Sequence, residues 1–199
     1  MAALTLLGVG AMNSPRYRPA GLLVTWAGHR VMLDGGGPAD PGPGLDSWCV
    51  SDDRAELIPQ IRRRADELGV HPARGPFEAD GVRLRALPVQ HTAHPTAGYL
   101  IETDTQRAVW APEFWVFPPW ARGADLMFAD AAGWDRPIRF AGGVGGHACV
   151  CDVAAQARRL GVRRLVFAHI GRPTIRAIDQ GAQPPFGQWG REGQVFQLR

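Results

Sequence analysis

Short apolar runs, separated by glycine, proline and polar residues, recur along most of the chain. Runs of about four to eight such residues are typical of buried strands. They predict strands over residues 3–8, 21–26, 29–33, 48–50, 82–89, 97–103, 107–111, 125–129, 164–168 and 194–198. The second and third of these flank the dipeptide Ala27-Gly28, which predicts a hairpin at that turn.

Three other segments place their apolar residues at helical spacing. Residues 53–68, 151–160 and 173–179 are predicted helices, and a glycine directly follows the first two. Strands that come first, followed by helices between further strands, favour two sheets sandwiched between helices. A chain of 199 residues is long enough for one well-buried core, so we expect a single domain over residues 1–199.

Composition excludes several classes of protein. Hydrophobic residues make up 45% of the chain, which is too many for a disordered protein. The net charge of +3 is too small to predict nucleic-acid binding, and the arginine clusters lie on predicted helices, where they suit a solvated face. Three cysteines without framework spacing favour reduced thiols and a cytoplasmic location. No stretch is long and apolar enough to predict a membrane-spanning helix.

Four histidines follow predicted strands or loops, where the scaffold holds a side chain firmly and leaves it open to a cleft. His91 and His94 come after a strand, and they suit either a metal ion or hydrogen bonds within a turn. His147 follows a glycine-rich loop before a helix, which suits an anion site or a structural turn. His169 ends an apolar strand, as a catalytic or a buried core histidine would.

The order of these segments resembles the metallo-β-lactamase superfamily. Within it, the chain is most similar to the phosphodiesterase branch that includes ribonuclease Z and the cyclic phosphate phosphodiesterase of phosphonate breakdown. The resemblance implies a metallo-β-lactamase-like αββα sandwich of the α/β class. Its motifs cover nearly the whole chain: LLGVG at 6–10, VMLDGG at 31–36, PVQHTAHPTAGY at 88–99, AVWAPEF at 108–114, DLMFADAA at 125–132, GHA at 146–148 and LVFAHI at 165–170.

The resemblance also implies roles for individual residues. His91 and His169 match the family's metal-ligand histidines, and Glu113 lies near the position of its metal-bridging aspartate. His147 matches a proton-transfer histidine, and Asp130 matches an acidic position of the site. We therefore expect His147 and Asp130 to act in catalysis.

The family's T-H-x-H-x-D-H motif is absent from this sequence. Laid on that motif, the segment SDDRAEL puts Asp52, Arg54, Glu56 and Leu57 where His, His, Asp and His would stand. Losing three imidazoles removes the usual zinc pair, because nitrogen-rich sites favour zinc and oxygen-rich sites favour harder ions.

Three interpretations of this segment follow. In the first, its two carboxylates complete a site for one divalent ion rather than two (zinc, manganese or iron), and the ion activates a bound water. In the second, Arg54 occupies the metal position as a fixed cation paired to Glu56 or Glu113. In the third, Asp53 and Glu56 only favour the start of a helix. The ligands of the first interpretation are Asp52, Glu56, His91, Glu113 and His169.

The first interpretation predicts a metal-dependent hydrolase of a phosphodiester or another small ester or lactone. Its predicted substrate contacts are His94, Arg54 and Gly146. The second predicts a catalytically degenerate member of the fold that binds a ligand or a protein. We expect a small-molecule substrate and no membrane partner, and we leave a homodimer open. Nucleic acid is not the expected substrate, because the chain has no room for the long arm with which ribonuclease Z-type enzymes grip tRNA.

Overall fold

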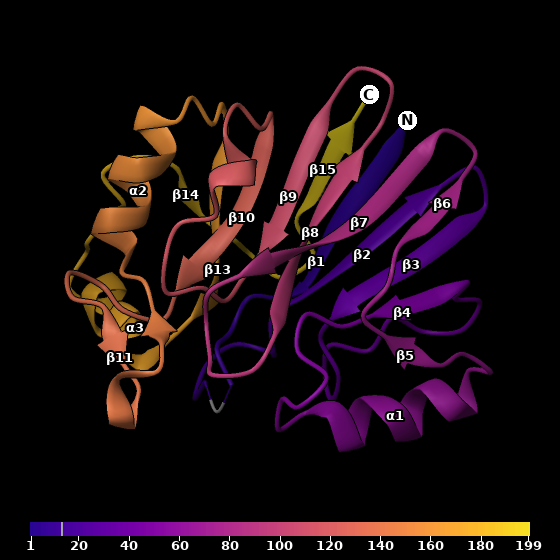
Figure 1. The fold of residues 1–199 in the computed structure, drawn as a ribbon, viewed down its shortest axis with the longest axis horizontal. Coiled ribbons are helices and arrows are strands. Elements are labelled where there is room, and N and C mark those ends of the chain that lie inside the picture. The colour runs from indigo at the N-terminus through magenta and orange to yellow at the C-terminus, as the bar shows by residue number, and fades with distance from the viewer. Residues whose placement is uncertain (13) are drawn as a thin grey trace.

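Two β-sheets pack against each other through a shared core in the computed structural model, which describes residues 1–12 and 14–199 (Figure 1). The first sheet runs, in order, through β15 (Val195–Leu198), β1 (Ala2–Gly8), β2 (Gly21–Trp26), β3 (His29–Asp34), β4 (Ser47–Cys49) and β5 (Pro72–Ala73). The second runs through β14 (Gln188–Trp189), β13 (Leu165–Ile170), β10 (Leu126–Ala131), β9 (Arg107–Ala111), β8 (Thr96–Glu102), β7 (Val82–Val89) and β6 (Phe77–Ala79).

Helices cover the outer sides of both sheets. Figure 1 shows α1 (Ile58–Glu67) beside the first sheet, and α2 (Val150–Arg159) and α3 (Arg172–Asp179) at the far side of the second. A small hairpin of β11 (Ile138–Arg139) and β12 (Gly146–His147) projects beside α3 and encloses the 3₁₀ turn η2 (Ala141–Gly143). The remaining 3₁₀ turn is η1 (Pro119–Ala121). This arrangement confirms the predicted αββα sandwich.

Alternation along β2 and β3 shows how the first sheet is covered on both faces. Leu22 and Val24 belong to the core between the sheets, whereas Leu23 and Met32 pack in a second cluster with Ile61 of α1. Successive side chains of a strand face opposite sides, so a strand covered on both sides is apolar throughout. This is why these segments read as continuous apolar runs in the sequence.

Three neighbouring strands of the second sheet set the position of the site. β9, β10 and β13 run parallel to one another. The carboxyl ends of parallel strands meet at one edge of a sheet, which is where ligands bind in α/β folds. Glu113 follows β9, Asp130 lies at the end of β10 and His169 lies at the end of β13. The topology therefore brings three residues that are distant in sequence to one edge.

The first predicted helix begins later than its apolar spacing indicates. Residues 53–57 form turns, and α1 begins at Ile58, with Pro59 in its first turn. Proline is tolerated there because the first helical N–H groups have no partner within the helix. The prediction of a helix over residues 53–68 is therefore wrong at its start, and so is the idea that Asp53 and Glu56 lie in its first turn.

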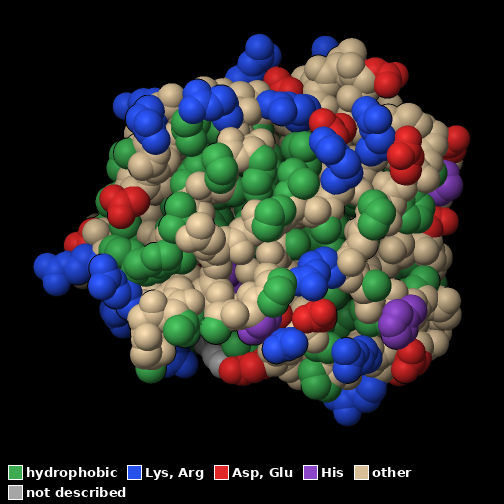
Figure 2. All heavy atoms as spheres, viewed as in Figure 1, with side chains coloured by type: hydrophobic (Ala, Val, Ile, Leu, Met, Phe, Trp, Pro, Cys, Tyr) green, Lys and Arg blue, Asp and Glu red, His purple; other side chains and the backbone are tan. Residues whose placement is uncertain are grey.

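Figure 2 shows hydrophobic side chains gathered on one face of the molecule, with arginine side chains along its upper edge. A hollow of about 540 Å³ lies between α2 and the segment that follows β9, lined in part by Trp115, Phe117 and Val153. In the part of the chain that the structure describes, no helix has both the length and the apolar character needed to cross a membrane.

Candidate active site

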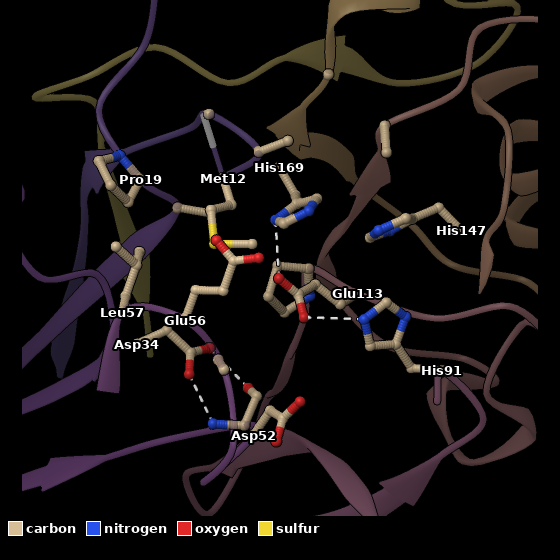
Figure 3. Close-up of a pocket in the computed structure, with 18 of the residues that line it drawn as sticks. Met12, Pro19, Asp34, Asp52, Glu56, Leu57, His91, Glu113, His147 and His169 are labelled. Carbon is tan, nitrogen blue, oxygen red and sulfur yellow. Dashed lines mark hydrogen bonds and ion pairs between the residues drawn. The ribbon is translucent and has the colours of Figure 1, made fainter. Parts of the chain in front are cut away.

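The largest concentration of predicted site residues lines a pocket of about 610 Å³. The turn segment before α1 contributes Asp52, Arg54 and Glu56 to its wall. The second sheet and its loops contribute the others, namely His91, His94, Glu113, His147 and His169. Figure 3 shows that Glu113 lies between the side chains of His91 and His169 in this pocket. Asp130 and Gly146 lie behind the wall, where each contacts one of these histidines.

The carboxylate of Glu113 joins two imidazole rings. Its Oε2 lies 3.2 Å from Nε2 of His91, and its Oε1 lies 3.2 Å from Nδ1 of His169 (Figure 3). Both histidines are buried. Each oxygen of the carboxylate therefore contacts a different ring.

Burial and charge act in opposite directions on this trio. Burial alone would raise the pKa of Glu113, but the adjacent imidazoles outweigh it and lower that pKa. Burial would also lower the pKa of His91, but its hydrogen bond and charge interaction with Glu113 raise it to about 9. For His169 burial prevails, so its pKa is lowered. These shifts favour an ionised Glu113 paired with a protonated His91.

The other nitrogen of His91 fixes the orientation of its ring. Nδ1–H donates to the carbonyl of Gly146 over 2.9 Å, and the amide of Gly146 donates back to the carbonyl of His91 over 2.9 Å. A Cβ at position 146 would lie 1.9 Å from the carbonyl oxygen of Ile138, so only glycine fits there. Gly146 thus positions His91 through its backbone, and the contact with substrate that we expected of it stays a prediction.

His147, which is partly buried, pairs with the buried Asp130. Its Nδ1 lies 2.8 Å from a carboxylate oxygen of Asp130, which also accepts backbone N–H groups from Phe114 and Ala132. Burial disfavours the charged ring, but the charge and hydrogen bond of Asp130 outweigh it and raise the pKa of His147. The ring stacks on His169 with centroids 5.0 Å apart, and it lies 4.6 Å from the ring of His91. The structure thus places the predicted catalytic pair beside the Glu113 trio.

His169 stands in a backbone conformation that side chains rarely adopt. Its φ angle is +58°, which costs about 1–3 kcal/mol for a residue that is not glycine. Hydrogen bonds on its carboxyl side hold the chain there, from the amide of Ile170 to Val9 and from that of Gly171 to Ala131. Such strain is concentrated at functional sites.

The segment SDDRAEL, which stands where the family has its histidine motif, matches neither the metal-site interpretation nor the interpretation in which Arg54 pairs with a carboxylate. Asp52 is buried, and both of its oxygens accept from Nε2 of His94, at 2.8 and 2.9 Å. Its Oδ1 also accepts the backbone N–H of Arg54 over 2.8 Å. Arg54 is exposed at the pocket and, within residues 1–12 and 14–199, forms no ion pair. The predicted pairing of Arg54 with Glu56 or Glu113 is therefore wrong, because the guanidinium forms an ion pair with neither carboxylate.

The donor groups do not fit a metal centre of the kind that the resemblance implies. Among the described residues, no group of three or more His, Cys, Asp or Glu side chains is arranged so that it could hold an ion. Glu113 is shared between two rings, Asp52 is engaged by His94, and Arg54 offers no lone pair. Glu56 points into the pocket but has no partner in the described part of the chain (Figure 3). The predicted five-ligand site is not assembled in this arrangement.

Asp34 is a positioning residue that the sequence reasoning did not single out. Its partly buried carboxylate accepts from the amide and hydroxyl of Ser51, both at 2.6 Å, and from Nε1 of Trp110 at 2.7 Å. Burial raises its pKa to about 6, although these hydrogen bonds oppose that shift. Asp34 has a φ of +52° at the end of β3. The signal that could have found it is a polar residue before three glycines at a strand end.

Comparison with known proteins gives a family match and a set of similar folds. The profile of the beta-lactamase superfamily domain matches residues 37–170. The metallo-beta-lactamase fold protein YhfI from Bacillus subtilis is 14% identical, with a TM-score of 0.76 and coverage of 99% of this chain and 100% of that one. A diphosphatase from the PhnP family is 17% identical, with a TM-score of 0.71 and coverage of 98% and 96%.

The short form of human tRNase Z has a similar fold as well. It is 13% identical, with a TM-score of 0.69 and coverage of 99% of both chains. At these identities the likeness establishes the fold alone. A search of curated proteins gives no match.

Proposed function

This chain belongs to the metallo-β-lactamase superfamily, and on that premise we propose that it hydrolyses a phosphodiester or another small ester or lactone. The superfamily consists largely of metal-dependent hydrolases, and the predicted resemblance to it is confirmed. The observation that carries the proposal is the pair of His147 and the buried Asp130, which lies beside the trio of His91, Glu113 and His169.

This arrangement supports two parts of an ester hydrolysis. Leaving-group departure needs a proton donor, and a carboxylate that raises the pKa of a histidine favours the protonated ring that can serve as that donor. His147 meets that description, because Asp130 raises its pKa. The transition state gains negative charge, and Arg54 and Arg172, which line the pocket, are the cations that can stabilise it.

The proposal assigns no step to a metal ion. The superfamily generally uses divalent ions, and one zinc, manganese or iron ion was our expectation from the sequence. Here its candidate ligands are paired with one another. We therefore expect metal analysis of protein purified without a chelating tag to find less than about a tenth of an equivalent of transition metal. A full equivalent would contradict this part of the proposal.

The size and lining of the pocket support a small substrate. A pocket of about 610 Å³ lies in the range of small-molecule sites. Ile138 and Phe140 form apolar wall beside the histidines, and Met12 and Leu57 form more of it across the pocket (Figure 3). A substrate with a compact apolar part next to the scissile bond suits this lining.

The test is a set of chromogenic and lactone substrates: bis(4-nitrophenyl) phosphate, 4-nitrophenyl butyrate and dihydrocoumarin. We expect turnover of at least one, and a loss of about 100-fold in kcat for His147→Ala and for Glu113→Gln. His71→Ala, which changes an exposed histidine outside the pocket, is the control and should retain full activity. Absence of turnover with all three substrates, or activity that His147→Ala leaves intact, would overturn the proposal.

A further inference from the structure

A second carboxylate–imidazole pair faces the same pocket. Asp52 and His94 both line it, and both oxygens of Asp52 lie within 2.9 Å of Nε2 of His94. The side chain of Asp52 is 8% exposed, whereas that of His94 is 25% exposed. The carboxylate is thus shielded from water while the ring remains accessible to a ligand.

Several contacts hold this pair in place. The Oδ1 atom of Asp52 also accepts the amide of Arg54, which closes a tight turn. Ser51, the preceding residue, is held by two hydrogen bonds to Asp34, and its carbonyl accepts the amide of Ala97 at the start of β8. The carbonyl of His94 accepts the hydroxyl of Thr92 over 3.1 Å. These contacts join the first sheet, the second sheet and the loop that carries His94.

The contact with Asp52 determines which ring nitrogen is free. A carboxylate accepts a hydrogen bond, so Nε2 of His94 carries the hydrogen and Nδ1 carries the lone pair. Nδ1 has no hydrogen-bond partner among residues 1–12 and 14–199. An imidazole oriented by a carboxylate through one nitrogen accepts protons at the other. This is the arrangement of a general base.

We propose that His94, oriented by Asp52, is the base that activates water in this pocket and takes the place of the ion-bound water of the superfamily. The proposal rests on the hydrolase function proposed above. Asp52 aligns with the first histidine of the missing motif, so the position that would bind an ion instead orients a base.

The two histidine–carboxylate pairs divide the proton transfers of hydrolysis. Nδ1 of His94 takes a proton from water, and the water oxygen forms a bond to the phosphorus or acyl carbon. The bond from that atom to the leaving oxygen breaks, and the leaving oxygen takes a proton from His147. His94 then returns its proton to solvent, His147 regains one, and the sum is ester plus water. Asp52, His94 and His147 all line the same pocket, and in the close-up Asp52 and His147 lie on different sides of Glu113 (Figure 3).

The kinetic test compares His94→Ala and Asp52→Asn with His29→Ala, using whichever of the three substrates the wild type turns over. His29 is a matched control, because it pairs with Asp80 over 3.1 Å at 28% side-chain exposure but lies outside the pocket. We expect kcat to fall about 100-fold in His94→Ala and about 10-fold or more in Asp52→Asn, with KM little changed. Added imidazole should partly restore His94→Ala, and excess EDTA should leave wild-type turnover unchanged.

Three results would overturn the inference: unchanged kcat in His94→Ala, no rescue by imidazole, or loss of wild-type turnover in EDTA. Each leaves the proposed hydrolase function standing, because the wild type still turns over substrate before EDTA is added. A measurement without substrate is also decisive. Long-range ¹H–¹⁵N spectra should show hydrogen on Nε2 of His94 in the wild type and a changed tautomer population in Asp52→Asn. Hydrogen on Nδ1 of His94 in the wild type would refute the role of His94 as a base, whichever substrate the enzyme uses.

Discussion

Nδ1 of His147 lies 2.8 Å from a carboxylate oxygen of Asp130, and Asp130 has no exposed surface. The other contacts of that carboxylate are neutral backbone N–H groups, from Phe114 and Ala132. The charge of Asp130 and its hydrogen bond raise the pKa of His147, although burial of the ring opposes that shift. One side chain thus anchors two loops at the edge of the sheet and sets the charge of the candidate proton donor.

Replacing Asp130 by Asn tests both roles of this carboxylate, namely anchoring the loops and raising the pKa of His147. The amide has one oxygen where the carboxylate has two, so at least one of the three donors loses its acceptor, and the pKa of His147 falls because the negative charge is gone. We expect a loss of about 1–3 kcal/mol in unfolding free energy and of about 100-fold in kcat. Urea unfolding measures the loss of stability, and an NMR titration measures the change in the pKa of His147.

A surface carboxylate is the control for this variant. Asp179 pairs with Arg16 at 2.7 Å, and both side chains are well exposed. Asp179→Asn should therefore change stability by no more than about 1 kcal/mol and leave kcat unchanged. If Asp130→Asn left the pKa of His147 where it is in the wild type, the role of Asp130 would be wrong.

The pairing of His91 with Glu113 should make stability depend on pH. The pKa of His91 is raised to about 9 in the folded protein from its ordinary 6.5, so the folded state binds the proton more tightly. Its stabilisation is full below about pH 6.5 and is lost as the pH rises through about 9. We expect unfolding free energy to fall by about 1–3 kcal/mol over that interval.

Urea unfolding at several pH values, in the wild type and in His91→Gln, tests this dependence. Glutamine cannot bind the proton, so the difference between the two proteins should shrink as the pH rises. His71→Gln, at an exposed position, should follow the wild type. A difference that stayed constant or grew towards pH 9 would mean that His91 is not charged in the folded protein.

Sequence patterns could place the candidate residues at strand ends but not show which side chains meet there. Glu113 and His169 follow apolar runs, and parallel strands bring such ends together, so their proximity was predictable. The contact of Asp52 with His94 was not, because it joins two loops from different sheets, and a hydrogen bond depends on tertiary geometry that spacing does not encode. The start of α1 could have been placed from Pro59, since proline is disfavoured inside a helix.

Replacing Asp34 tests how the segment that begins at Ser51 is held in place. Its three hydrogen bonds connect β3 to Ser51 and to Trp110 of β9, and its φ of +52° favours Asp or Asn over most side chains. Asp34→Ala removes both acceptor oxygens, and with them all three hydrogen bonds, and keeps the strained backbone, so we expect a loss of about 3 kcal/mol or more. Ser51→Ala removes one hydrogen bond and should cost about 1 kcal/mol. Equal losses in the two variants, measured by urea unfolding, would contradict this role.

Phe140 should control both substrate binding and the charge of the histidines. It lines the pocket, and its ring lies edge-on to His91 and His147, with centroids 5.3 and 5.4 Å apart. Phe140→Ala removes apolar contact area, so we expect KM for 4-nitrophenyl butyrate to rise about 5–10-fold. Removing the ring also admits water. Because burial is what opposes the charged form of His147, the pKa of that ring should rise further in this variant.

Val144→Ala is the matched control for Phe140→Ala. Val144 lies in the same β11–β12 hairpin, is 54% exposed and does not line the pocket. Its replacement should leave KM, kcat and the titration of His147 unchanged, because it touches neither the substrate nor the histidines. If Val144→Ala raised KM as much as Phe140→Ala, the effect would come from the hairpin as a whole. If Phe140→Ala lowered the pKa of His147, the ring would be stabilising the charged form rather than excluding water from it.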